Sequence, residues 1–100
     1  MYTKYNSTYV IIRTYSAGVF FGIVDQYDDK VILLKNARRM RRWKNLGREI
    51  SLTGISILGV HPESQIERPV NEILLQWIEI LPCTEESIAT FAAQPAATVN

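Results

Sequence analysis

Three runs of β-branched and aromatic residues, separated by very short connections, constrain the fold of this chain more than any other feature. They are YVIIRTY (9–15), VFFGIVD (19–25) and KVILLKNA (30–37). Such residues favour strands, and connections this short join antiparallel neighbours. The sequence therefore predicts three sequential strands, the last two forming a hairpin across QYDD (26–29). The apolar run Val10–Ile12 predicts burial on both faces of the first strand, or a central position for it.

The second half of the chain predicts one more strand and one helix. Segment 46–60 fits either a short helix or an alternating strand, and its three glycines argue against one long helix. Segment 70–81 has a helical stripe of apolar residues and also a strand-like alternation; its β-branched and aromatic residues and the proline that follows favour a strand. Thr84, followed by two glutamates, predicts the N-cap of a helix over 84–94. We expect an α+β, mainly β fold: a small antiparallel sheet or barrel with a C-terminal helix.

Length and composition predict one domain over residues 1–100, with flexible ends at 1–8 and 95–100. The chain is 47% hydrophobic, which supports a modest core and favours self-association into a homo-oligomer. A single cysteine forms no internal disulfide and fits a reducing compartment. The stretch 50–62, which has no Asp, Glu, Lys or Arg, is too short to span a bilayer. We expect a soluble cytoplasmic protein that does not contact membranes.

Residues that could perform catalysis are sparse. The one histidine, His61, precedes a proline in a predicted loop, and Cys83 fits a small buried residue at a strand end. Glu85 and Glu86 are adjacent, so on a helix their side chains diverge. The sequence contains no phosphate-binding glycine loop, no dinucleotide fingerprint and no metal-ligand spacing. We therefore expect a protein that is not an enzyme and has no metal and no cofactor.

Positive charge is segregated in one short segment. Residues 35–48 hold seven Lys and Arg and no acid, whereas the other 86 residues sum to a charge of −6. The segment includes Arg38, Arg39, Arg41, Arg42 and Trp43. Guanidinium groups bind phosphate bidentately and stack on flat rings, and an indole beside them can stack on a base. A field this concentrated suits a compact anion at least as well as a long nucleic acid.

Two alternatives for this segment stay open at the level of sequence. It could be a solvated charged edge that protects a strand from pairing with another chain. Trp43 could equally be a core anchor. An extended backbone would place Arg39, Arg41 and Trp43 on one face, and Arg38, Met40 and Arg42 on the other. Both faces then carry charge, so one of them must meet water, an acidic neighbour or a ligand.

Three stretches of the chain resemble a family of small proteins from tailed bacteriophages and prophages, classed as a domain of unknown function. The resemblance covers residues 9–90. Its most specific parts are RTYSAGV (13–19), NARR (36–39) with Trp43, and EILPC (79–83). Positions held here by Arg41 and Arg42 are often aromatic in that family, so this chain departs toward charge and toward anion binding.

The resemblance implies a role in counter-defence, because small phage proteins of this kind include sponges, oligomers that trap nucleotide messengers of bacterial immunity. By that analogy, the chain would sequester a cyclic nucleotide or ADP-ribose-type second messenger in the host cell cytoplasm without cleaving it. The bases would stack on Trp43 or Tyr15, and Ser16 and the Gly18 backbone would join the four arginines on phosphate. The alternatives are a host defence protein or nucleic acid bound by the same basic segment, and a role as a virion component.

Overall fold

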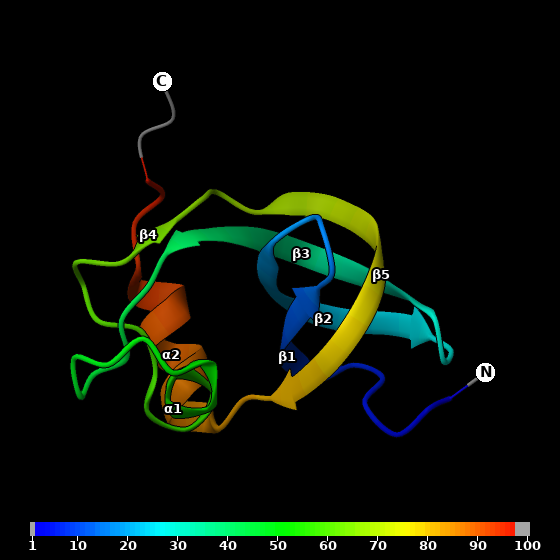
Figure 1. Ribbon diagram of the computed structural model, residues 1–100, viewed down its shortest axis with the longest axis horizontal. Coiled ribbons are helices and arrows are strands. Elements are labelled where there is room, and N and C mark those ends of the chain that lie inside the picture. The colour runs from blue at the N-terminus through cyan, green and yellow to red at the C-terminus, as the bar shows by residue number, and fades with distance from the viewer. Residues whose placement is uncertain (1, 98–100) are drawn as a thin grey trace.

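The computed structural model describes residues 2–97 and has four strands that close into a small barrel (Figure 1). Its elements are β1 (Tyr9–Thr14), β2 (Val19–Tyr27), β3 (Val31–Arg42), α1 (Leu52–Leu58), β4 (Gln65–Ile66), β5 (Val70–Pro82) and α2 (Glu85–Ala93). All strand pairs are antiparallel in the order β2-β1-β5-β3-β4, and β2 also pairs with β3, which closes the ring β1-β2-β3-β5. The predicted mainly β architecture with a C-terminal helix is confirmed.

The predicted hairpin between the second and third strands is confirmed, and the third strand is longer than expected. Asp28 forms its turn by accepting hydrogen bonds from the backbone N–H groups of Lys30 and Val31, at 2.8 and 2.9 Å. These bonds hold the pKa of the Asp28 carboxyl below its usual value. Strand β3 then continues through the basic segment to Arg42. Arg38, Arg39, Arg41 and Arg42 therefore belong to the barrel wall.

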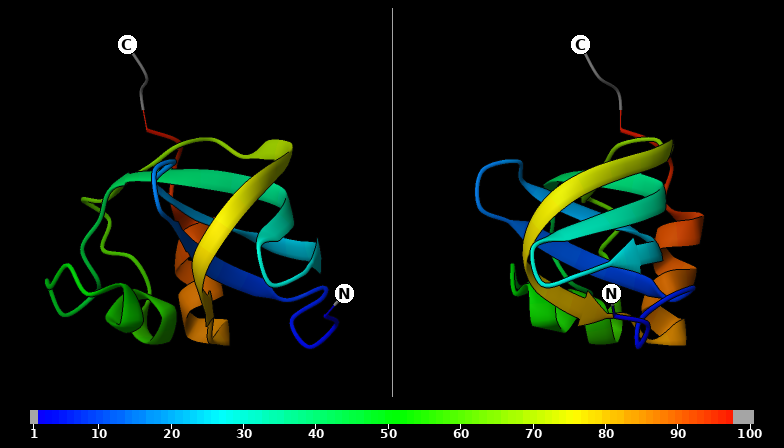
Figure 2. Two further views of the ribbon diagram at one scale, coloured as in Figure 1. Left: turned by 45° about the vertical axis from the view of Figure 1, so that its right-hand side comes forward. Right: turned by 90° about the vertical axis from the view of Figure 1, so that its right-hand side faces the viewer.

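Both ambiguous segments have a definite structure. The strand expected over 70–81 is confirmed as β5, whereas 46–60 contains the short helix α1. Ser51 caps α1 by accepting from the N–H of Gly54, and Gly59 ends it with φ 104° and ψ 179°. Thr84 caps α2 as predicted, by accepting from the N–H of Ser87 at 3.2 Å. The two helices lie side by side against one part of the barrel (Figures 1 and 2).

The core consists of two clusters on opposite faces of the barrel wall. The barrel interior holds Val10, Ile12, Phe20, Val24, Tyr27, Ile32, Leu34, Ala37 and Leu75. The second cluster packs under the helices and β4 and holds Ile11, Val19, Phe21, Met40, Ile55, Val60, Ile66 and Phe91. Strand β1 contributes to both clusters, so the expected burial of its two faces is confirmed. Phe21 and Phe91 stack at 3.8 Å between ring centroids and join α2 to the wall.

Gly22 lies opposite a bulge in β3, which explains a glycine inside a strand. A Cβ on Gly22 would lie 3.0 Å from the carbonyl oxygen of Lys35 and 3.2 Å from the Cα of Ala37. Between these two residues, Asn36 adopts φ 51°, a left-handed conformation that asparagine tolerates. The register of β2 on β3 shifts at the same point. The close approach therefore requires the smallest residue on β2.

Both described ends of the chain are hydrogen-bonded to strands of the sheet. The backbone N–H of Tyr2 donates to the carbonyl of Tyr27, and the ring of Tyr5 lies 5.9 Å from that of Tyr27. The N–H of Ala97 donates to the carbonyl of Ile66 at 2.8 Å. The flexibility expected of 1–8 and 95–100 stays a prediction, and it concerns in part residues 1 and 98–100, which lie outside the described residues. None of the helices described within 2–97 has the length and hydrophobicity needed to cross a bilayer.

Cys83, directly after β5, gives the fold a pH dependence. Burial raises the pKa of its thiol to about 11 from an ordinary value of 9.0. The unfolded chain then ionises first, so this stabilisation is fully present below pH 9.0 and is lost as the pH rises through about 11. When the pH rises from 9.0 to about 11, the free energy of unfolding should fall in both proteins. We expect the fall to be about 2 kcal/mol smaller in Cys83→Ala than in the parent. Urea unfolding of both proteins at neutral and alkaline pH measures this; parallel losses would contradict it.

Candidate anion-binding groove

The structure distributes the eight predicted site residues over three places. Arg38 points under α2. Tyr15, Ser16, Gly18 and Arg39 lie at the turn between β1 and β2 and beside it. Arg41, Arg42 and Trp43 line a groove at the end of β3. Only the last group meets the expectation of arginines and an indole around one concave surface.

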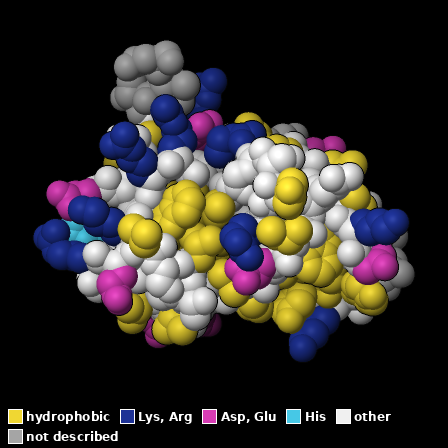
Figure 3. All heavy atoms as spheres, in the orientation of Figure 1, with side chains coloured by type: hydrophobic (Ala, Val, Ile, Leu, Met, Phe, Trp, Pro, Cys, Tyr) yellow, Lys and Arg dark blue, Asp and Glu magenta, His cyan; other side chains and the backbone are white. Residues whose placement is uncertain are grey.

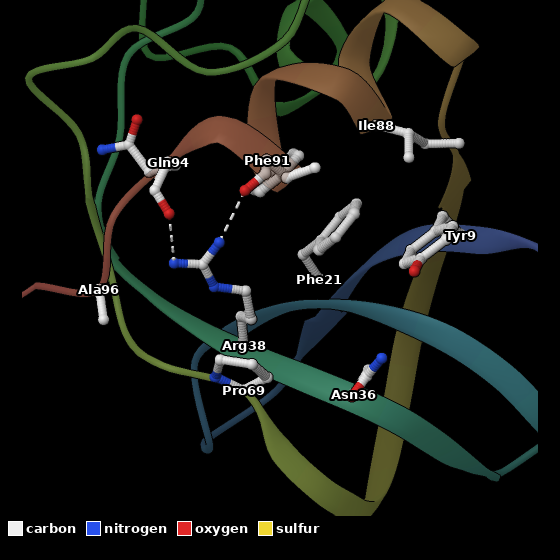
Figure 4. Close-up of a pocket in the computed structure, with 10 residues that line it drawn as sticks. Tyr9, Phe21, Asn36, Arg38, Pro69, Ile88, Phe91, Gln94 and Ala96 are labelled. Carbon is white, nitrogen blue, oxygen red and sulfur yellow. Dashed lines mark hydrogen bonds between the residues drawn. The ribbon is translucent and has the colours of Figure 1, made fainter.

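Arg38 is a structural residue, and we remove it from the binding set. Its side chain is buried, with the residue only 8% exposed. The guanidinium donates to main-chain carbonyls of Glu67 and Phe91, both at 2.7 Å, and to those of Gln94 and Ile66 at 3.0 and 3.4 Å. Figure 4 shows it directed toward the last turn of α2. Burial lowers its pKa. Its donors are occupied within the protein, so it has little left to offer a phosphate.

The pocket drawn in Figure 4 is accordingly a poor anion site. It has a volume of about 320 Å³ and lies between β3, α2 and the segment around Pro69. The rings of Tyr9 and Phe21, stacked at 5.1 Å, form one wall, and the Asn36 amide forms part of another. Arg38 contributes its aliphatic side-chain carbons and a guanidinium whose N–H groups are already bonded to main-chain carbonyls. The pocket therefore combines rings and aliphatic groups with polar groups, and the donors of its one arginine are already engaged.

The β1–β2 turn places Arg39 beside Gly18, away from any cavity that includes the indole. Gly18 has φ 101°, and its carbonyl accepts from the Thr14 hydroxyl at 2.7 Å. The Arg39 guanidinium lies over the Phe20 ring, 4.5 Å from its centroid, and donates to the Ala17 carbonyl. Tyr15 is 90% exposed. The cavity beside it measures about 120 Å³ and includes neither an arginine nor Trp43.

The groove at the end of β3 is larger and positively charged. Its volume is about 520 Å³, and it is lined by Arg41, Arg42, Trp43, Lys44, Ile50, Glu63, Ser64 and Gln65. In Figure 3 the Lys and Arg side chains gather at the end of the molecule that carries the histidine, with acidic side chains among them. Within residues 2–97, Arg42 forms no ion pair, whereas the Nε of Arg41 lies 3.9 Å from a Glu67 oxygen. Arg42 is therefore the cation most available to a ligand.

Trp43 is both a core anchor and a groove wall. It packs partly against the second core cluster, and its Nε1 donates to the carbonyl of Ile50 at 3.0 Å. The register of β3 on β4 shifts between Met40 and Arg42. The alternation of side chains between the two faces of β3 is therefore interrupted before Trp43. Trp43 does not share a face with Arg39, as an unbroken strand would predict, and it packs with the cluster that contains Met40. The two roles left open for the indole are compatible.

Hydrogen bonds join the two sides of the groove. Asn45 is 1% exposed, and its Oδ1 accepts from the N–H groups of Gly47 at 2.8 Å and Glu49 at 3.2 Å. These bonds shape the loop that carries Ile50. Across the groove, the Ser64 hydroxyl accepts from the Lys44 N–H at 3.0 Å and donates to the Lys44 carbonyl at 3.2 Å. The groove is thus built from segments fixed to one another.

Glu63 is the acidic group of the groove. Its Oε1 lies 3.4 Å from Lys44 Nζ, 3.7 Å from Arg48 Nη1 and 3.6 Å from His61 Nδ1. Lys44 is the main cause of a lowered Glu63 pKa, with smaller effects from His61 and Arg48. The carboxyl is therefore ionised at neutral pH. Sequence reasoning missed this residue and also Ile50, Ser64 and Gln65. The pairing of β3 with β4 brings Glu63, Ser64 and Gln65 to the groove and the loop shaped by Asn45 brings Ile50, and no local motif marks any of them.

Comparisons with known proteins give a family and no activity. The model of a domain of unknown function, DUF6948, matches residues 7–91. The match spans all five strands, α1 and most of α2, and includes every residue that lines the groove. No curated protein and no solved structure matches the chain.

Proposed function

This chain belongs to the DUF6948 family, and we propose that it binds a small phosphate-bearing ligand, a nucleotide, in the groove at the end of β3. One observation carries the proposal. Arg41, Arg42 and Trp43, chosen for their chemistry, line a single concave surface, with Lys44 beside them. If these side chains had projected from a convex surface, the alternative interpretation, a charged strand edge that contacts only water, would have been favoured.

The groove suits a nucleotide in size and chemistry. Its volume of about 520 Å³ lies within the range of roughly 300–1,000 Å³ that small-molecule sites occupy. Arg41 and Arg42 supply charge for phosphate. Trp43 and Ile50, which is 75% exposed, supply an apolar surface on which a base can pack. Binding and retention need no nucleophile or general base, so the ligand would be held without being cleaved.

We further propose that the ligand is a nucleotide second messenger, of cyclic or ADP-ribose type, which the protein sequesters in the host cell cytoplasm as a phage counter-defence factor. Support comes from the resemblance of the YVIIRTYSAGVFFGIVD and LKNARRMRRWK stretches to small phage proteins. A second copy placed over the open groove would enclose a ligand that one barrel covers on one side only.

Arg42→Ala is expected to weaken nucleotide binding by about tenfold or more, because it removes the unpaired guanidinium of the groove. Isothermal titration calorimetry against cyclic dinucleotides, cyclic mononucleotides and ADP-ribose measures this, and chromatography of the ligand checks that it is recovered intact. Arg13→Ala is the matched control, since Arg13 is an exposed β1 arginine paired with Glu79 outside the groove. The parent binding none of the panel, or equal losses in both variants, would refute the proposal.

A second candidate is a macromolecular partner held by the same basic end: a nucleic acid or a host defence protein. It is favoured by exposed groups beyond the groove, because Arg48 lies beside Glu63 and Leu46 is 48% exposed. Affinity for oligonucleotides that rises with length and falls steeply with salt would identify a nucleic acid partner. A stable complex from host lysate that resists Arg42→Ala would point to a protein partner and a different surface.

A further inference from the structure

Glu63 is unexpected in a groove that binds phosphate. A carboxylate repels a phosphate, and its lowered pKa keeps it ionised at neutral pH. It nevertheless lines the same groove as Arg41, Arg42 and Lys44. Part of any anionic ligand near Glu63 must therefore be uncharged and must offer hydrogen atoms.

One oxygen of Glu63 remains available for such a ligand. Lys44, Arg48 and His61 approach Oε1, and no hydrogen bond within residues 2–97 reaches Oε2. The Glu63 side chain is 60% exposed and its contacts with Lys44 and Arg48 are 3.4 and 3.7 Å long. Exposed ion pairs of this kind contribute little. The carboxylate can therefore turn to a ligand at small cost.

The strand register gives the groove a direction. Arg42 is paired with Gln65, and the next contacts along the groove are Lys44 with Ser64 and then with Glu63. Phosphate held by Arg41 and Arg42 at one end leaves the base of a nucleotide to extend along Trp43 and Ile50 toward Glu63. Arg42 and Glu63 thus lie at different positions along the groove, so a phosphate and a hydrogen-bonding base edge can be held apart as they are in a nucleotide.

We propose that Glu63 selects guanine, an inference that rests on the proposed nucleotide site and specifies its ligand. A carboxylate accepts two parallel hydrogen bonds from adjacent N–H donors. The Watson–Crick edge of guanine offers N1–H beside the N2 amino group. Adenine and cytosine place a ring acceptor beside their amino group, and uracil has one N–H between two carbonyls. Guanine alone among these bases supplies a donor pair to Glu63.

The test compares GMP with AMP and UMP by calorimetry. We expect the parent to prefer GMP by about tenfold or more. Glu63→Gln retains the shape but offers one oxygen and one donor in place of two acceptors, so GMP affinity should fall and the preference should shrink to about threefold or less. AMP affinity should be unchanged or higher, because a negative charge has been removed. Glu67→Gln, which alters an acid paired with Arg41 outside the groove lining, should keep the preference.

The outcomes separate this inference from the function on which it rests. Equal binding of GMP and AMP that still depends on Arg42 would overturn guanine selection and leave the nucleotide site in place. A preference for GMP that survives Glu63→Gln would assign selection to another residue and would also overturn it. Binding of no nucleotide by the parent would refute both proposals. Thermal unfolding of each variant shows whether a loss of affinity reflects a loss of fold.

Discussion

Replacing Arg38 by methionine is expected to reduce the free energy of unfolding by about 3 kcal/mol or more. The change leaves the carbonyls of Glu67 and Gln94 without their donor, and it removes one of the two donors of the Phe91 carbonyl, which keeps the N–H of Gln94. Each buried acceptor left unpaired costs about 1–3 kcal/mol, which exceeds what is recovered by no longer burying a charge. Urea unfolding followed by tryptophan fluorescence measures the loss.

Arg41→Met is the control for this prediction, because it makes the same chemical change three positions along the same strand. Arg41 is exposed, and its ion pair with Glu67 is 3.9 Å long, so the expected loss is below about 1 kcal/mol. Arg38→Lys should recover only part of the stability, since an ammonium cannot reach four carbonyls in the plane of a guanidinium. Equal losses for Arg38→Met and Arg41→Met would show that the buried hydrogen bonds contribute little.

Gly59→Ala is expected to destabilise the fold by a similar amount, at least about 3 kcal/mol. Gly59 ends α1 with φ 104° and ψ 179°, a conformation that is essentially restricted to glycine. A Cβ there would also overlap Thr90, approaching its Cβ to 2.9 Å and coming closer still to its Oγ1 and Cγ2. Thr90 cannot easily move away, because its hydroxyl accepts from the Val60 N–H and donates to the Ser87 carbonyl. Strain and overpacking therefore add.

Gly18→Ala separates these two costs. Gly18 has a similar φ of 101°, but the nearest atom to a Cβ placed on it is Arg39 Nη1 at 3.6 Å, an ordinary contact. It should lose only the conformational part, about 1–2 kcal/mol. Thermal and urea unfolding of both variants gives the difference, which we attribute to the clash with Thr90. A Gly18→Ala loss as large as that of Gly59→Ala would contradict this attribution.

The sequence predicted most of the fold because its strong signals are local. Strand residues and short turns indicated β1 to β3, and Thr84 with its glutamates indicated α2. Segment 46–60 was undecided because Ile50, Leu52, Ile55 and Leu58 suit a short helix, whereas Ile55, Ile57 and Gly59 alternate as in a strand. The partner that decides between them is distant in sequence: Ser87 of α2 donates its hydroxyl hydrogen to the carbonyl of Ile55, which is buried beneath it.

The candidate site was only partly predictable, because contacts between residues distant in sequence decide which of its side chains are buried. Composition identified the basic segment, but neighbouring arginines in it differ in their surroundings. Arg38 is buried because α2 and residues 66–67 place four carbonyls above it, at sequence separations of 28 to 56 residues. Tyr15, Ser16 and Gly18 share a turn with Arg39 and lie in no cavity with Trp43. Strand pairing, which no local motif encodes, supplied Glu63 and Gln65.

The hydrogen bonds of Asn45 and Ser64 have a kinetic consequence. These bonds hold both sides of the groove, so capture of the proposed nucleotide would require no rearrangement of the loops. Association would then proceed at a rate set by diffusion and by the attraction of the basic end for an anion, an attraction that weakens as ionic strength rises. If the proposed function is correct, the protein would compete for a scarce nucleotide through fast association, and it would discriminate between nucleotides through their different dissociation rates.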